Sequence, residues 1–169
     1  MAKQQAKTLH DLFHDTLKDI FFAEKKILTA LPKMAKAAHS PDLQAAFHKH
    51  ESETEGHVDR LEQVFAMIDE PAKGKTCEAI NGIIDEGNDV IKEFKRSPAL
   101  DAGLLSAAQA VEHYEISRYG TLKTWAQELG LSDAVSLLDA TLQEEIKTDK
   151  TLTDLAKSAI NLEAKEAAE

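Results

Sequence analysis

The stretch LLSAAQAVEHYEISRYGTLKTWAQEL, residues 104–129, decides the fold of this 169-residue chain. Its apolar residues recur at steps of three and four, as they do along one face of an α-helix. That face is apolar at both ends, for example at Leu104 and Leu122, but Glu112 and Glu115 occupy its middle. An inward helical face with an acidic centre predicts a polar site inside a helical protein.

Three other stretches, residues 13–34, 43–68 and 135–160, repeat this pattern of apolar ends and a polar middle. The residues that interrupt their inward faces are Glu24 in the first, His50, Thr54 and His57 with Glu53 beside them in the second, and Glu145 and Asp149 in the third. Measured from turns near Ser40 and Leu131, Glu24 and Glu115 lie 16 residues away, or ~24 Å at the helical rise. The same distance on the other side of each turn falls between Glu53 and His57 and between Glu145 and Asp149. All four polar centres are therefore expected at one level.

The composition agrees with long helices and excludes several classes of protein. Ala occurs 25 times and Leu 19 times, whereas Gly and Pro together number 11, which disfavours an all-β fold. The net charge of −10 disfavours nucleic acid as a partner. A single cysteine, Cys77, cannot form an internal disulfide. No apolar run is long enough to span a membrane, and the N-terminal residues are too polar for a secretory signal. We therefore expect a cytoplasmic protein that does not enter a membrane.

We expect a single domain, residues 1–169, and the positions of helix caps and prolines divide it into five helices. Thr8, Ser40, Thr76, Ser97 and Ser132 are the expected N-terminal caps, and a kink is expected at Pro32. The helices are predicted at about residues 9–38, 41–68, 77–95, 98–129 and 133–161. Two short turns make two antiparallel hairpins, and the long segment between them predicts a crossover that carries the short third helix. An up-down-up-down bundle with a surface helix is the alternative.

Several buried carboxylates need a compensating positive charge, and basic residues are scarce on the inward faces. A bound multivalent cation supplies it. Oxygen ligands with one or two imidazoles suit iron or manganese better than zinc. The predicted metal ligands are Glu24, Glu53, His57, Glu112, Glu115, Glu145 and Asp149, with His50 as the alternative imidazole to His57. Tyr114 and Tyr119 are expected to pack or hydrogen-bond beside them.

The segments LHDLFHDTLKDIFFAEKKILTALPKMAKAA (9–38), HESETEGHVDRLEQVF (50–65), CEAINGIIDEG (77–87), AAQAVEHYEISRYGTLKTWA (107–126) and TLQEEIKTDKTLTDLA (141–156) resemble the YciE/YciF-like family of bacterial stress-associated proteins. More widely, the chain resembles the rubrerythrin-type branch of the ferritin-like superfamily of di-iron carboxylate proteins. That resemblance implies a ferritin-like four-helix bundle holding two iron ions. The superfamily pattern places a histidine three residues after the glutamate of the second helix, where this chain has Gly56 followed by His57.

Three functions follow from this sequence. The first is a di-metal protein, with iron preferred to manganese, that oxidises Fe(II) with dioxygen or hydrogen peroxide during stress. The second is a helical stress protein that is not an enzyme, with a structural metal or a role in protein contacts. The third is a small manganese catalase-like protein. The wide apolar face of residues 77–95 also predicts a homodimer.

Overall fold

The computed structural model describes residues 6–166, which form helices and no strand. The elements are α1 (Leu9–Ala37), α2 (Pro41–Met67), α3 (Glu78–Phe94), α4 (Leu100–Glu128), α5 (Ser132–Leu155), a π-helical turn η1 (Ala156–Ile160) and α6 (Asn161–Glu166). The all-α class predicted from composition and periodicity is confirmed. Within the described range, no helix combines the length and the apolar character that crossing a membrane requires.

Two of the predicted caps form as expected. The Thr8 hydroxyl accepts a hydrogen bond from the Asp11 backbone N–H, and the Asp11 carboxylate accepts one from the Thr8 N–H at 2.7 Å, which completes a capping box. The Ser40 hydroxyl accepts from the Leu43 N–H in the turn before α2. These bonds satisfy N–H groups that the first turn of a helix leaves free.

The other three caps were predicted wrongly. Cys77, rather than Thr76, precedes α3, and its sulfur accepts from the Ile80 N–H. The Ser97 hydroxyl accepts from the Ala99 N–H in a turn, so α4 begins at Leu100. Gly130, with a φ of 72°, ends α4 as predicted, but Leu131 then leads directly into α5 and Ser132 is already helical.

The helix around Pro32, where a kink or irregular turn is expected from the sequence, does not end at the proline. α1 runs through Pro32 as one α-helix to Ala37. A π-helical turn lies near the other end of the chain, at η1 between α5 and α6.

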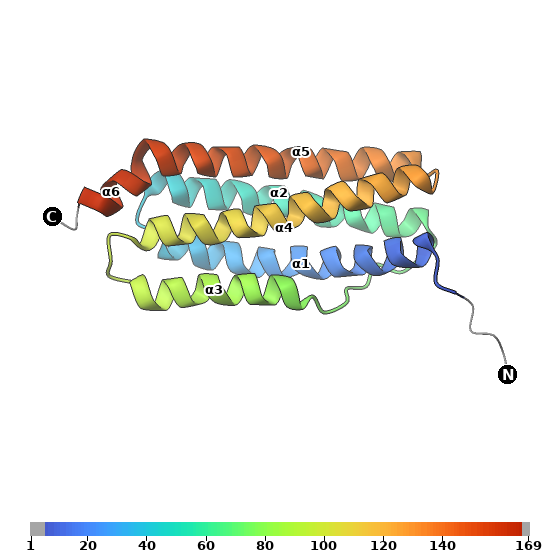
Figure 1. Cartoon of the computed structure of the whole chain (residues 1–169), viewed down its shortest axis with the longest axis horizontal. Coiled ribbons are helices and arrows are strands. Elements are labelled where there is room, and N and C mark those ends of the chain that lie inside the picture. The colour runs from blue at the N-terminus through green and yellow to red at the C-terminus, as the bar shows by residue number, and fades with distance from the viewer. Residues whose placement is uncertain (1–5, 167–169) are drawn as a thin grey trace.

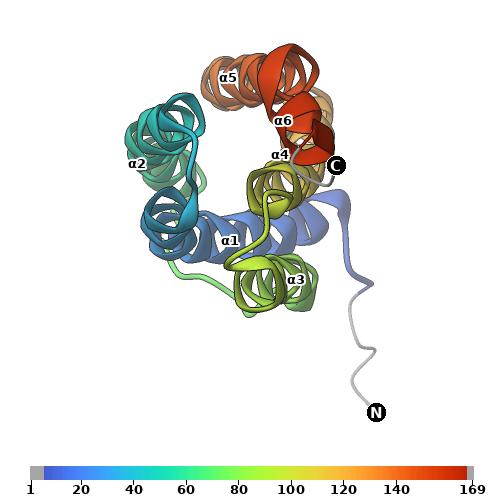
Figure 2. The same ribbon diagram turned by 90° about the vertical axis from the view of Figure 1, so that its left-hand side faces the viewer.

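The four long helices surround a common interior, as the end-on view in Figure 2 shows. α1 contacts α2, α2 contacts α5, α5 contacts α4 and α4 contacts α1. α1 with α2 and α4 with α5 form antiparallel hairpins, whereas α2 and α4 run in the same direction (Figure 1). This arrangement needs the long crossover and differs from the up-down-up-down alternative, in which α2 and α4 would be antiparallel.

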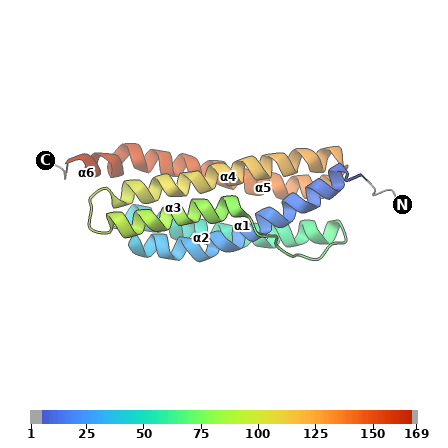
Figure 3. The same cartoon turned by 60° about the horizontal axis from the view of Figure 1, so that its bottom comes forward.

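The crossover helix α3 lies outside this ring, along α1 and α4 (Figure 3). Small residues allow the close approach: a Cβ built on Gly103 would lie 2.6 Å from Val90 Cγ1, and one built on Gly87 would lie 3.4 Å from Ala107 Cβ. Much of the apolar face of α3 is therefore used within the chain, while Phe94 near its end remains 41% exposed.

Candidate metal centre

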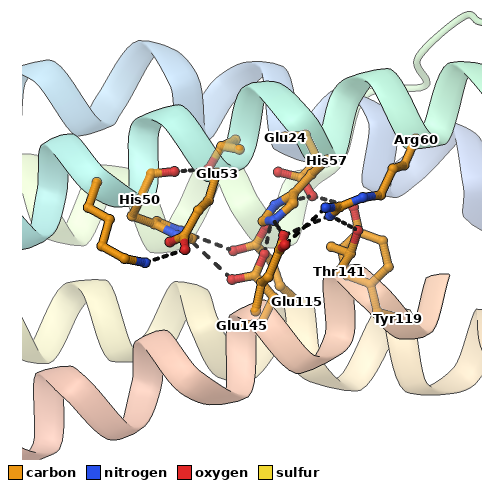
Figure 4. Close-up of polar contacts among 12 residues, drawn as sticks. Glu24, His50, Glu53, His57, Arg60, Glu115, Tyr119, Thr141 and Glu145 are labelled. Carbon is orange, nitrogen blue, oxygen red and sulfur yellow. Dashed lines mark hydrogen bonds and ion pairs between the residues drawn. The ribbon is translucent and has the colours of Figure 1, made fainter. Parts of the chain in front are cut away.

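Four helices each place an acidic or imidazole side chain at the same level of the interior, with apolar side chains filling both ends. Glu24 comes from α1, His57 from α2, Glu115 from α4 and Glu145 from α5, and each is 0% exposed. Figure 4 shows these side chains pointing toward one another from the surrounding helices. The structure thus brings together groups that the sequence separates by up to 121 positions.

The buried groups form two overlapping sets of four residues. The Glu24–His57 set contains Glu24, His57, Glu115 and Glu145. The His50–Glu112 set contains His50, Glu112, Glu115 and Glu145. In each set, one ligand atom from every residue lies within 4.8 Å of the others, and Glu115 and Glu145 belong to both.

The two imidazoles face the carboxylates from the same helix, with ring centroids 6.2 Å apart. His57 Nδ1 lies 2.9 Å from Glu145 Oε1 and 3.5 Å from Glu24 Oε1. His50 Nε2 lies 3.2 Å from Glu112 Oε1 and 3.9 Å from Glu145 Oε2. These separations leave a lone-pair-bearing atom of each residue directed at a shared space.

Most of these buried atoms lack a hydrogen bond, despite their closeness. Those without a hydrogen-bond partner among the described residues include Glu24 Oε2, both nitrogens of His50, His57 Nδ1, Glu112 Oε2, and both oxygens of Glu115 and of Glu145. Buried polar atoms are normally satisfied, because leaving one unpaired costs about 1–3 kcal/mol, more for a charged group. Unpaired oxygen and nitrogen atoms facing one space are the donor set that a bound metal ion would satisfy, so the residues present fit such an ion.

The pKa values of the buried groups also show that this cluster of carboxylates lacks compensating positive charge. Burial raises the pKa of Glu112 and of Glu115 well above the usual range, and the charge of Glu145 raises both further. Burial would lower the pKa of His57, but Glu145 and Glu24 together raise it to about 10. Without a metal, the cluster therefore balances its negative charge with bound protons.

Groups outside the two sets hold some of the ligand residues in place. The Tyr119 hydroxyl donates a hydrogen bond to Glu24 Oε1, in line with the sequence expectation for that tyrosine. His57 Nε2 lies 3.0 Å from Glu144 Oε2, and Arg60 donates to both oxygens of Glu144 at 2.7 and 2.9 Å. Sequence reasoning missed Glu144 and Arg60, because neither lies on an inward apolar face.

Two predicted ligands lie beside the two sets rather than within them. Glu53 Oε1 accepts from Lys49, and Asp149 Oδ1 accepts from Gln109 at 3.0 Å and lies 3.2 Å from His113 Nε2. In the second helix, the inward positions are those of His50 and His57, two turns apart, because α2 continues without a bulge past Gly56. Glu53 lies three positions after His50 and four before His57, so it shares their side of α2. Its Oε2 is buried without a hydrogen-bond partner among the described residues, but Glu53 belongs to neither set.

Comparison with known proteins agrees with the resemblance to YciF-like stress proteins seen in the sequence. Residues 8–165 match the family described as "Domain of unknown function (DUF892)". Protein YciF of Escherichia coli K12 is 44% identical over 159 residues, which cover 94% of this chain and 96% of YciF.

Solved structures support the same relationship. The E. coli stress protein YciF has a TM-score of 0.88 at 44% identity, over 92% of this chain and 99% of that one. YcfI of Rhodopseudomonas palustris, for which a structural role is suggested, has a TM-score of 0.84 at 41% identity, over 90% and 98%. XCC3681 of Xanthomonas campestris shares the fold, with a TM-score of 0.72 at 18% identity, over 96% and 100%. By sequence match and by close relatives, the chain belongs to the DUF892 family.

Proposed function

We propose that this chain is a ferritin-like di-metal carboxylate protein, in which α1, α2, α4 and α5 form a four-helix bundle around two metal ions, with iron preferred to manganese. The observation that carries the proposal is the pair of overlapping ligand sets that share Glu115 and Glu145. Two adjacent ions joined by shared carboxylates need this kind of arrangement.

The division of ligands follows from the two sets. Glu24 and His57 would hold one ion, His50 and Glu112 the other, and Glu115 and Glu145 would contact both. The four carboxylates carry four negative charges when ionised, which two divalent cations balance. Glu53 and Asp149, counted among the ligands from sequence, are not needed for this balance.

The imidazoles distinguish this site from the common superfamily pattern, in which two different helices each supply a histidine. Here both come from α2, at positions 50 and 57. Because the two residues are seven positions apart, they lie on one helix face at different depths, and each serves one set.

Bound iron would supply the electrons for reducing dioxygen or hydrogen peroxide, as Fe(II) is oxidised. The protein's own contribution is to hold the ligands and to keep bulk water away. Glu24, His57, Glu115 and Glu145 are fully buried, and apolar residues such as Phe13 at one end and Leu104 at the other close the interior. A role in stress is consistent with the relative YciF, which is described as a stress protein.

Anaerobic titration of metal-free protein with Fe(II), followed by exposure to dioxygen or hydrogen peroxide, tests this function. We expect about two ions per chain and a faster oxidation than in buffer alone. Glu115→Gln should lose the paired binding, because Glu115 belongs to both sets, whereas the exposed control Glu62→Gln should bind as the wild type does.

The outcomes separate the candidate functions. Absence of bound iron and manganese from the wild type would refute the di-metal proposal. Tight binding without oxidation by either oxidant would refute the oxidase part and favour a structural metal. Manganese bound in preference to iron, with hydrogen peroxide breakdown, would favour the catalase-like alternative.

We also propose that the chain forms a homodimer. The apolar surface of α3 left for a partner is smaller than the sequence indicated, because Val90 of α3 packs against Gly103 of the same chain. Phe94 at the end of α3 is the large apolar side chain of that helix that remains exposed.

A further inference from the structure

The two ligand sets differ in how firmly their individual members are held. Each set has one carboxylate and one imidazole of its own, Glu24 with His57 and Glu112 with His50. Glu115 and Glu145 are common to both, so these separate pairs are where the two sets differ.

His57 is fixed through the nitrogen that faces away from the carboxylates. Its Nε2 lies 3.0 Å from Glu144 Oε2, while its Nδ1 faces Glu145 and Glu24. Arg60 in turn fixes Glu144 by donating to both of its oxygens, and it also donates to the Thr141 hydroxyl at 3.1 Å (Figure 4). An imidazole whose second nitrogen is engaged in this way keeps one ring orientation.

Glu24 is held as well. Its Oε1 accepts the hydrogen bond of Tyr119, which is fully buried on α4. The Tyr119 ring also packs edge-on to the His57 ring, with centroids 6.3 Å apart. Both separate members of the Glu24–His57 set are therefore positioned before an ion arrives.

The other pair has no such support. Within residues 6–166, neither His50 Nδ1 nor Glu112 Oε2 has a hydrogen-bond partner. Lys49 is nearby in the sequence, but it donates to Glu53. At the His50–Glu112 position, no outside hydrogen bond from the described residues fixes the free nitrogen of the imidazole or the free oxygen of the carboxylate before an ion binds, and such prior positioning favours binding.

We propose, on the basis of the di-metal function above, that the Glu24–His57 position binds its ion first and more tightly, and that Glu144, held by Arg60, is the positioning residue responsible for this order. The second ion, at the His50–Glu112 position, then binds more weakly and exchanges more readily. The site in this view has one resident ion and one exchangeable ion.

Titration of metal-free protein with Mn²⁺, followed by electron paramagnetic resonance, tests the order. The first equivalent should give the spectrum of an isolated Mn²⁺ ion, and the spectrum of a coupled pair should appear only with the second. Glu112→Gln should weaken binding of the second Mn²⁺ (the second phase of the titration) and leave binding of the first (the first phase) unchanged.

Glu144→Ala should weaken the first phase by about 10–100-fold, which is the usual effect of losing a residue that supports a metal ligand. Glu144→Gln keeps an oxygen that can accept from His57 Nε2–H and should restore most of that affinity. Asp139→Ala is the matched control, because Asp139 also lies on α5 and pairs with another helix through Lys123 at 3.0 Å, yet belongs to neither set. It should leave both phases unchanged.

The results distinguish this inference from the proposed function. If no Mn²⁺ or Fe(II) binds, the di-metal function itself fails. If two ions bind in a single phase, or if Glu144→Ala weakens the second ion rather than the first, the di-metal function stands and the order is refuted. Equal effects of Glu144→Ala and Asp139→Ala would also refute the positioning role.

Discussion

Replacing Glu115 by Gln should stabilise the metal-free protein, although it removes a residue from both ligand sets. Both carboxylate oxygens of Glu115 are buried without a hydrogen bond from the described residues, and burial raises its pKa well above the usual 4.5. The folded chain therefore either carries an unpaired charge or takes up a proton there. Gln has no such proton equilibrium, so the variant avoids this cost.

The magnitude follows from proton linkage. A carboxyl group that is ionised in the unfolded chain and protonated in the folded one costs at most 2.303RT times the difference between the pH and 4.5, which is about 3 kcal/mol at pH 7. The buried amide of the variant lacks a hydrogen-bond partner, as the protonated Glu115 does in the wild type. The costs of these two unpaired groups therefore largely cancel in the comparison. We therefore expect Glu115→Gln to raise the free energy of unfolding by about 1–3 kcal/mol at pH 7, and by much less at pH 5.

Urea denaturation in the presence of a chelator measures this, with Glu62→Gln on the exposed face of α2 as the control. The sign should reverse after loading with metal, because the wild type then gains binding free energy that the variant loses. A metal-free Glu115→Gln protein that is less stable than the wild type at pH 7 would refute the reasoning, since the carboxylate would then be a favourable group without an ion.

Further predictions concern pH, packing and assembly. The pKa of His57 is raised to about 10, so the stability that its protonated ring contributes is complete below pH 6.5 and is lost as the pH rises through 10. The metal-free protein should therefore unfold at a lower urea concentration at pH 10 than at pH 7. His57→Gln should reduce that difference. Gly103→Ala should destabilise the fold by about 1–3 kcal/mol in thermal or urea denaturation, because the new Cβ would meet Val90, whereas Gly82→Ala on α3, with open space around its Cβ, should stabilise it by up to about 1 kcal/mol. Phe94→Asp should shift the sedimentation mass from about twice 18.6 kDa to 18.6 kDa, and a wild type that is already monomeric would refute the dimer.

The helical periodicity predicted much of the interior. Glu24, Glu112, Glu115 and Glu145 interrupt apolar faces, so their inward direction was visible from spacing alone. The level at which they meet was predictable because an α-helix has a fixed rise and the two turns are short.

Contacts between side chains on the flanks of neighbouring helices could not be predicted from this periodicity. Arg60 and Glu144 lie on the flanks where α2 and α5 touch, and a one-dimensional pattern does not say which flank faces which. Glu53 was included among the ligands because a carboxylate near two histidines has ligand chemistry, and spacing alone did not show that Lys49 donates to one of its oxygens.

The sharing of Glu115 and Glu145 has a consequence for synthesis of the chain on the ribosome. The N-terminal hairpin emerges first and carries Glu24, His50 and His57, which is half or less of either set. Both shared carboxylates belong to the second hairpin, and Glu145 is on its last long helix. On the proposed function, a nascent chain therefore lacks a complete position for an ion until α5 has been made and packed against the other helices.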